Sequence, residues 1–353
     1  MIRTLLSDDL PRSRLLSALL LAVLVGLAIV PFVATGARAM NTAATICVFI
    51  VLVASYDLLL GYAGIVSFAH TMFYGIGAYG VGLALDAIGP TWWAVFTGLA
   101  TALLATLVLA LAIGLVSLRV RALFFAMITL AVASAFSVLA SQLSDFTGGE
   151  DGKSFAVPEV LRPGYRLLEA EFLGRQIDGR LLTYYLLFAG SVILFLILLR
   201  VVNSHFGRVL QAIRENDFRA ESLGYRTVVY RTMANCIAAL VATLAGALMA
   251  LWLRYVGPKT MLSFEVMTDI LLIVVIGGMG RMYGAVIGSV LFILAQNYLQ
   301  IGMGRASEGL GAVPWLARVI HPDRWMLWMG ILFIACVYYF PSGIVGRLRG
   351  NGK

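Results

Sequence analysis

The sequence predicts an all-α polytopic membrane protein with about ten transmembrane helices. Of its 353 residues, 61% are hydrophobic and 12% are charged, about half the charged fraction of roughly 25% that soluble domains carry. The mean hydropathy is +0.94. Apolar runs of about 20 residues recur along the chain, which is the length an α-helix needs to cross a bilayer. These runs are longer than the strands of an outer-membrane barrel.

The apolar runs predict ten spans within one transmembrane permease domain, residues 1–353. We expect spans near 13–35, 41–60, 64–86, 91–117, 121–142, 181–202, 229–252, 266–280, 284–303 and 325–341. The first run precedes an A-x-A sequence at 37–39. It is longer than the ~7–15 apolar residues of a signal peptide, so we expect it to remain as a span. Only GGMGRMYG separates the eighth and ninth spans, which could instead form one broken helix.

The distribution of Lys and Arg predicts the orientation. A cytoplasmic N-terminus and C-terminus place most basic residues of the short loops in the cytoplasm, as the positive-inside rule requires. Residues 143–180 then form a periplasmic segment, and 203–227 form the largest charged cytoplasmic segment. The net charge of +8 is scattered between apolar runs, so we expect no nucleic-acid partner. Cys47, Cys236 and Cys336 form no C-x-x-C pair, which predicts no metal site.

The third span contains a glycine motif in YGIGAYG. Gly75, Gly77 and Gly80 have the G-x-G-x-x-G spacing of a dinucleotide site. That site needs a preceding strand and an acidic residue about 20 positions later, whereas the nearest acid here is Asp86. Small residues let helices approach closely in lipid. We therefore interpret Gly75 and Gly82 as parts of a helix-packing surface.

Four polar residues of the same span have helical spacing. Ser67, His70, Thr71 and Tyr74 occupy positions i, i+3, i+4 and i+7, which predicts one shared helix face. A polar stripe at membrane depth is a candidate lining for a solute path. The alternative is a set of interhelical hydrogen bonds without a role in transport.

Two further features lie at span ends. Asp57 ends the second span; it could be a buried functional group, but we favour an interfacial position. Gly280, Gly284 and Gly288 repeat every four residues, which predicts a second packing surface. LLLGYAG and VVIGGMG each place G-x-x-G at the end of an apolar run. Because duplicated halves are common in transporters, an internal duplication is one reading of this similarity.

Residues 203–227 predict two short amphipathic helices between the sixth and seventh spans. Val209, Leu210 and Ile213 cluster on one face. Asn216 is a good N-cap residue that can end one helix and start another, and Gly224 is a natural stop. Such a segment could lie on the membrane surface or dock into a groove of a soluble partner. Its mixed charges argue against a purely lipid-binding helix.

Four blocks of the chain resemble the branched-chain amino acid ABC permeases of the LivM type. They are GYAGIVSFAHTMFYGIGAYG, FTGGEDG, GRVLQAIRENDFRAESLGY and GGMGRMYGAVIG, and they occur in the family's order. The resemblance implies the fold of the larger, type II-like importers in the bacterial inner membrane. Its implied partners are a second permease subunit of the LivH type, two cytoplasmic ATPase subunits and a periplasmic substrate-binding protein. The expected cargo is a branched-chain amino acid or related small polar solute; urea or a short amide is the alternative.

The resemblance also assigns roles to residues. It implies coupling to the ATPases by Arg208, Leu210, Ile213, Arg214, Glu215, Asn216, Ala220, Leu223 and Gly224. Because a docked helix buries its apolar face in the partner, we expect Leu210, Ile213 and Leu223 to face the ATPase. The sequence lacks G-x-x-x-x-G-K-[ST], so we expect ATP hydrolysis on separate chains and no enzymatic activity or cofactor here.

The block TGGEDG is expected at the outer end of the fifth span. It supplies Gly148, Gly149, Glu150, Asp151 and Gly152. One interpretation is a tight turn that needs positive φ at Gly149 or Gly152. The other is a contact with the binding protein or a part of the outer mouth.

Two other classes of protein compete with an ABC permease. A stand-alone secondary transporter or channel would need coupling carboxylates at mid-span, whereas Asp57 and Asp269 are placed near span ends. An intramembrane enzyme would need a motif such as H-E-x-x-H, which the sequence does not contain. The sequence therefore favours the permease.

Overall fold

The computed structural model describes residues 14–33, 36–117, 122–166, 178–309, 321–340 and 343–349. Within these ranges ten helical segments are long and apolar enough to cross a membrane, as the sequence predicts. The helices that form them are α2 (Arg14–Val33), α3 (Ala37–Asp57), α4 (His70–Ile88), α5 (Trp92–Ser117), α6 (Ala122–Gln142), α8 (Gly179–Val202), α11 (Thr227–Leu253), α13 (Phe264–Gly277), α14 (Met282–Gly309) and α16 (Trp325–Tyr339).

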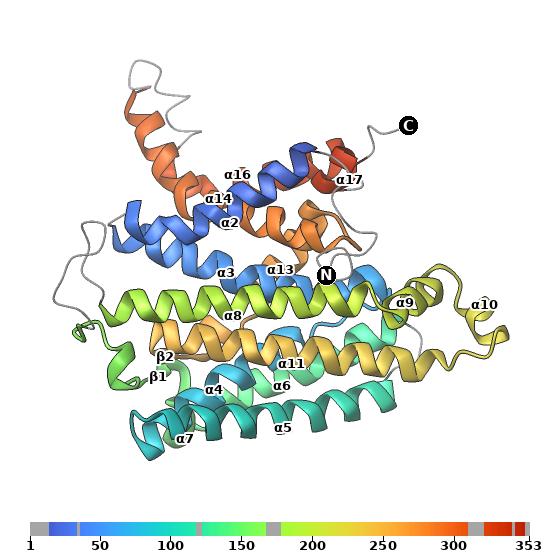
Figure 1. The fold of residues 1–353 in the computed structure, drawn as a ribbon, viewed down its shortest axis with the longest axis horizontal. Helices are drawn as coiled ribbons and strands as arrows, with labels where there is room; N and C mark the ends of the chain where they lie inside the picture. Colours follow the sequence, from blue (N-terminus) through green and yellow to red (C-terminus); the bar gives the residue numbers. More distant parts are fainter. Residues whose placement is uncertain are drawn as a thin grey trace.

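Short elements cap the two ends of the helical bundle (Figure 1). At one end lie α9 (His205–Glu215), α10 (Asp217–Ser222) and α17 (Ile344–Arg349). At the other lie α7 (Ser144–Thr147), the 3-10 turns Gly149–Asp151 and Glu159–Leu161, and strands β1 (Lys153–Ser154) and β2 (Tyr255–Val256), which pair antiparallel. The remaining short elements are α12 (Pro258–Met261) and the 3-10 turn Pro322–Arg324. We call the two ends the α9 end and the β1 end.

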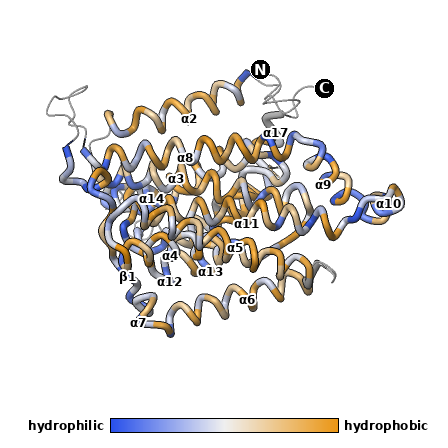
Figure 2. Tube along the Cα trace, turned by 60° about the horizontal axis from the view of Figure 1, so that its bottom comes forward, coloured by the Kyte–Doolittle hydropathy of each residue, from blue (hydrophilic) through white to orange (hydrophobic). Residues whose placement is uncertain are grey.

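Hydrophobic residues run along the helices, and hydrophilic residues gather at the two ends (Figure 2). Most of α3, α4 and α11 is buried, whereas most of α2 and α6 is exposed. The exposed side chains of α2, α5 and α6 include many large apolar ones, such as Leu21, Leu104 and Met127. A helix that exposes apolar side chains on its outer face is stable when lipid, not water, surrounds it. The described fold is therefore that of a polytopic membrane protein.

Glycines bring α4 and α11 into backbone contact. A Cβ on Gly77 would collide with the backbone of Thr243, and a Cβ on Gly246 would collide with the carbonyl of Tyr74. The predicted packing residues Gly75 and Gly82 also lie at close contacts. Gly75 packs against Leu262, and a Cβ on Gly82 would come within 2.8 Å of the Phe155 ring.

Two sequence expectations are wrong: that Ser67 shares a helix face with His70, and that Gly280 belongs to a helical glycine ladder. Helix α4 begins at His70, so Ser67 lies in the non-helical stretch before it and does not share its helix face. The eighth and ninth spans are two separate helices, as the list of ten spans predicts, and Gly280 lies in the turn between α13 and α14 with a φ of +76°. Only Gly284 and Gly288 of the predicted ladder are on a helix. Both face α13, where a Cβ on Gly284 would come within 2.8 Å of the Gly277 carbonyl oxygen.

Candidate functional site

The two short helices of residues 203–227 are separated by Asn216. Its backbone is extended, with a φ of −157° and a ψ of 100°, so α9 ends there. Its Oδ1 then accepts a hydrogen bond of 2.9 Å from the amide of Arg219 and caps α10. Asp217 pairs with Arg231 of α11 at 2.8 Å. Gly224 has a φ of +92° and ends the segment.

The apolar face of α9 is turned inward. Leu210 is 0% exposed and Ile213 is 1% exposed. Leu210 joins the main core, and Ile213 packs in a cluster with Val209 and Ala220. The expectation that Leu210 and Ile213 face a partner is therefore wrong. An amphipathic pattern shows that one face is buried but not what covers it, and here the rest of the chain covers it.

A different apolar pair is exposed on the α9 end. Phe218 of α10 is 81% exposed, and Leu223 just after it is 73% exposed. The sequence prediction included Leu223 but missed Phe218. The signal was present in DFRAES, where Phe218 stands among charged residues and is the residue most out of place on a solvated helix.

Arg214 connects α9 to two turns of the membrane domain. Its Nη1 donates a hydrogen bond to the carbonyl oxygen of Gly61, in the π-helical turn Leu58–Tyr62 that follows α3. A Cβ on Gly64 would lie 3.0 Å from the Cγ of Arg214, and one on Gly280 would lie 3.0 Å from its Nη1. The absence of side chains at Gly64 and Gly280 therefore leaves room for the Arg214 side chain.

Asp57 lies beneath this arginine and is buried, with 2% exposure. Its Oδ1 accepts a hydrogen bond of 2.8 Å from the amide of Gly280. The interfacial position that we favoured is wrong, because the turn between α13 and α14 folds over the end of α3. This turn also packs against Gly343, where a Cβ would collide with the backbone of Gly278. The α9 end thus gathers α3, α9, α13, α14 and the start of α17 around one carboxylate.

The predicted polar stripe is buried. Ser67, His70, Thr71 and Tyr74 are each 1–2% exposed. The Nε2 of His70 lies 2.9 Å from the hydroxyl of Ser55 and 3.2 Å from the carbonyl of Leu52. For His70 this geometry supports the interhelical hydrogen-bond interpretation. A role of the four residues in a solute path stays a prediction.

The block TGGEDG forms a compact turn at the β1 end. Gly148, Gly149 and Gly152 have φ values of +83°, +63° and +69°, as the tight-turn interpretation requires. The carbonyl of Asp151 accepts a hydrogen bond of 2.8 Å from Tyr255, and Glu150 lies 3.9 Å from Lys259. These contacts attach the predicted outer segment to β2 and α12, which connect α11 to α13.

The sequence matches a known protein family. The family of permease components of branched-chain amino acid transport systems matches residues 38–337. The chain belongs to this family. Its match extends from α3 to α16 and so includes α9, α10, Asp57, Arg214 and Gly280.

Named relatives support the assignment to this permease family. The chain is 26% identical, over 269 residues, to the high-affinity branched-chain amino acid transport system permease protein LivM of Salmonella typhimurium, and the match covers 72% of this chain and 61% of the relative. It is similar to the same extent to LivM of Escherichia coli. A probable LivM of Methanocaldococcus jannaschii is 23% identical over 323 residues, which cover 82% of this chain and 88% of the relative. The chain thus spans about 61% of the length of the two bacterial relatives. No solved structure matches the chain significantly.

Proposed function

We propose that this chain is the LivM-type membrane-spanning subunit of an ABC importer for branched-chain amino acids or related small polar solutes. The observation that carries the proposal is the contact of Arg214 with Gly61, beside the Asp57–Gly280 hydrogen bond. Through it, a helix outside the membrane is joined to the ends of α3, α13 and α14. A permease driven by a separate ATPase needs such a connection, because force applied to a surface helix must reach the spans.

The proposed ATPase contact is the exposed part of α9 and α10. Phe218 and Leu223 supply apolar anchors, and the same pair of helices also exposes charges such as Arg208 and Glu215. An apolar centre with a polar rim is typical of protein interfaces. Two cytoplasmic ATPases, a second permease subunit of the LivH type and a periplasmic binding protein complete the proposed assembly. In this assembly the α9 end and both termini lie on the cytoplasmic side of a bacterial inner membrane.

Uptake of radiolabelled leucine into proteoliposomes tests this function. The chain is reconstituted with the LivH-type subunit and the two ATPases, and the binding protein is added with leucine outside the vesicles. We expect uptake that needs both ATP inside and the ATPases. Vesicles that contain only the two permease chains are the control, and uptake by these at the full rate would show a stand-alone transporter instead.

A further inference from the structure

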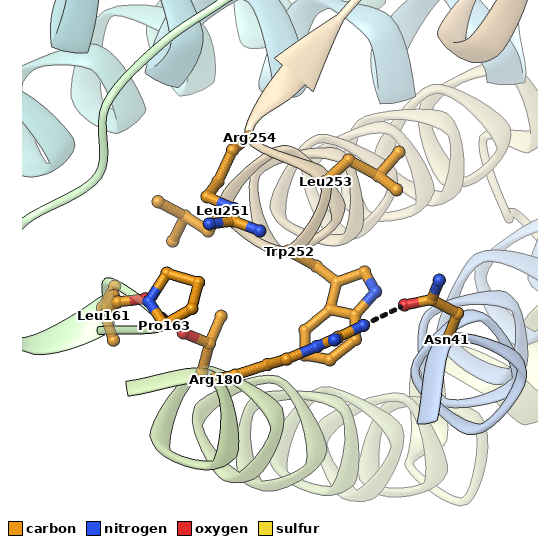
Figure 3. A pocket seen from close by; sticks show the side chains of 9 residues that line it. Asn41, Leu161, Pro163, Arg180, Leu251, Trp252, Leu253 and Arg254 are labelled. Carbon is orange, nitrogen blue, oxygen red and sulfur yellow. Dashed lines mark hydrogen bonds between the residues drawn. The ribbon is translucent and has the colours of Figure 1, made fainter. Parts of the chain in front are cut away.

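A small pocket lies at the β1 end, between α3, α8 and the end of α11 (Figure 3). It has a volume of about 160 Å³. Its walls are formed by the apolar residues Leu161, Pro163 and Leu251, by the ring of Trp252, and by polar or charged side chains that include Asn41, Arg180 and Arg254. The two arginines enter from different helices, Arg254 from the end of α11 and Arg180 from α8.

The charge of this pocket is not balanced by the described residues. No Asp or Glu of the described chain lies within ion-pair distance of Arg180 or Arg254. Arg180 donates one hydrogen bond of 3.0 Å to Asn41, and its guanidinium lies 5.6 Å from the centre of the Trp252 ring. The side chain of Arg254 makes no hydrogen bond to the part of the chain that the structure describes. Two cations held in one concave site favour an anion, and guanidinium groups match the geometry of a carboxylate.

The volume of the pocket limits how large a group it can enclose. An engineered protein cavity of about 150 Å³ holds one benzene molecule. The carboxylate of an Asp or Glu side chain with its methylene stem is smaller than benzene and fits this volume. A free branched-chain amino acid or a phospholipid headgroup with its glycerol is larger. Small-molecule sites also have volumes of about 300–1,000 Å³.

The composition of the pocket is that of a protein interface. Trp and Arg are the residues most enriched among side chains that dominate binding energy, and they cluster in pockets that the partner fills. Trp252 is buried, with 6% exposure, and forms part of the pocket wall. The pocket lies at the β1 end, opposite the proposed ATPase contact. The proposed periplasmic binding protein, called the delivering protein below, brings solute to this end and would contact the pocket.

We propose that Arg180 and Arg254 bind the carboxylate of an acidic side chain on the solute-delivering protein. This inference rests on the proposed function, which places the β1 end on the delivery side. The walls of Leu161, Pro163 and Trp252 contact the methylene stem, and the two guanidinium groups bind the carboxylate. The pocket thereby anchors the delivering protein in one orientation.

Binding of the fluorescently labelled delivering protein to the importer in nanodiscs tests the proposal. Arg180→Gln combined with Arg254→Gln is expected to raise the Kd at least tenfold at low salt and to flatten its salt dependence. Arg38→Gln is the matched control, because Arg38 is an exposed arginine at the same end that does not line the pocket. This control should change the Kd less than twofold. Equal binding by the double variant and the wild type would overturn the proposal.

Single variants keep the test informative if the double variant fails to fold. Arg254→Gln alone removes one charge without breaking a hydrogen bond within the described chain. The importer should therefore still assemble, and its affinity for the delivering protein should fall severalfold. Arg180→Lys retains the positive charge but loses the planar guanidinium group that can donate two parallel hydrogen bonds. Its Kd is expected to lie between those of the wild type and the double variant. If neither single variant changes the Kd, the proposal is wrong.

Two further outcomes separate the alternatives. Native mass spectrometry could find an anionic lipid that the wild type retains and the double variant loses, while both bind the delivering protein equally. That result would assign the pocket to a lipid headgroup and overturn the inference. A wild-type importer that does not bind the delivering protein at all would contradict the proposed function itself and remove the occupant that we assign.

Discussion

The backbone amide of Gly280 donates a 2.8 Å hydrogen bond to the carboxylate of Asp57, a residue 223 positions earlier in the chain. A Cβ at Gly61 would collide with both groups, so the close approach requires glycine there. The end of α3 and the turn between α13 and α14 are thereby joined, and Arg214 ties α9 to the same place. Four of our predictions concern these contacts and the helices around them.

Loss of the Asp57 carboxylate should destabilise the α9 end. Asp57→Ala leaves the buried amide of Gly280 without its acceptor, which typically costs about 1–3 kcal/mol. We expect a lower midpoint of thermal unfolding for the purified chain in detergent. Asp57→Asn keeps an acceptor oxygen and should retain more of this stability, and the exposed Asp145→Ala should have no effect. An unfolding midpoint for Asp57→Ala equal to that of the wild type would show that the hydrogen bond contributes nothing.

Arg214→Ala should uncouple ATP hydrolysis from transport. It removes a charged donor from the Gly61 carbonyl, and such a hydrogen bond is worth about 1.5–3 kcal/mol. That corresponds to a roughly tenfold or larger change in an equilibrium between conformations. We expect leucine uptake per ATP hydrolysed to fall while the complex still assembles. Arg38→Ala is the control, since Arg38 is exposed at the β1 end, away from the proposed ATPase contact; a similar loss in both variants would point to general charge effects.

Two pairs of apolar residues should behave differently. Phe218→Ser with Leu223→Ser removes exposed side chains, so it should reduce co-purification of the ATPases while the permease keeps its thermal stability. Leu210→Ala with Ile213→Ala removes buried side chains and should destabilise the permease itself, by about 2–5 kcal/mol per residue. Thermal unfolding and co-purification are measured for both. The opposite assignment of effects would mean that α9 turns its apolar face to the ATPase after all.

Gly284→Leu should separate α13 from α14. Even a Cβ at this position would come within 2.8 Å of the Gly277 carbonyl oxygen, so a larger side chain forces the helices apart. We expect a lower yield of the monodisperse permease in size-exclusion chromatography. Gly302→Leu on the same helix is the control, because no atom lies within 4 Å of its Cβ position. A normal yield for Gly284→Leu would show that this close packing is dispensable.

Labelling of introduced cysteines tests the orientation. In a Cys336→Ser background, Glu150→Cys and Glu215→Cys place exposed thiols at the β1 end and the α9 end, and the other two cysteines are buried. An impermeant maleimide applied to intact cells with a permeabilised outer membrane should label position 150 only. Labelling of position 215 under these conditions would contradict a cytoplasmic α9.

The sequence by itself determined the class of the protein and the approximate place of its helices. Apolar runs long enough to cross a bilayer are a local property, so ten spans could be located to within a few residues at most ends. The break at Asn216 and the positive φ values of the TGGEDG turn are also local, because the capping side chain and the glycines are encoded where they act.

Only the tertiary structure decided which partner each residue meets. From the sequence we placed Asp57 at the membrane interface, but in the structure a turn 223 residues later covers it. Leu210 and Phe218 are both apolar residues of one amphipathic segment, and the membrane domain buries the first and leaves the second exposed. Arg180 and Arg254 lie far apart in sequence and line one pocket. A hydropathy pattern records how strongly a side chain avoids water, whereas burial and pairing depend on which distant helix packs against it.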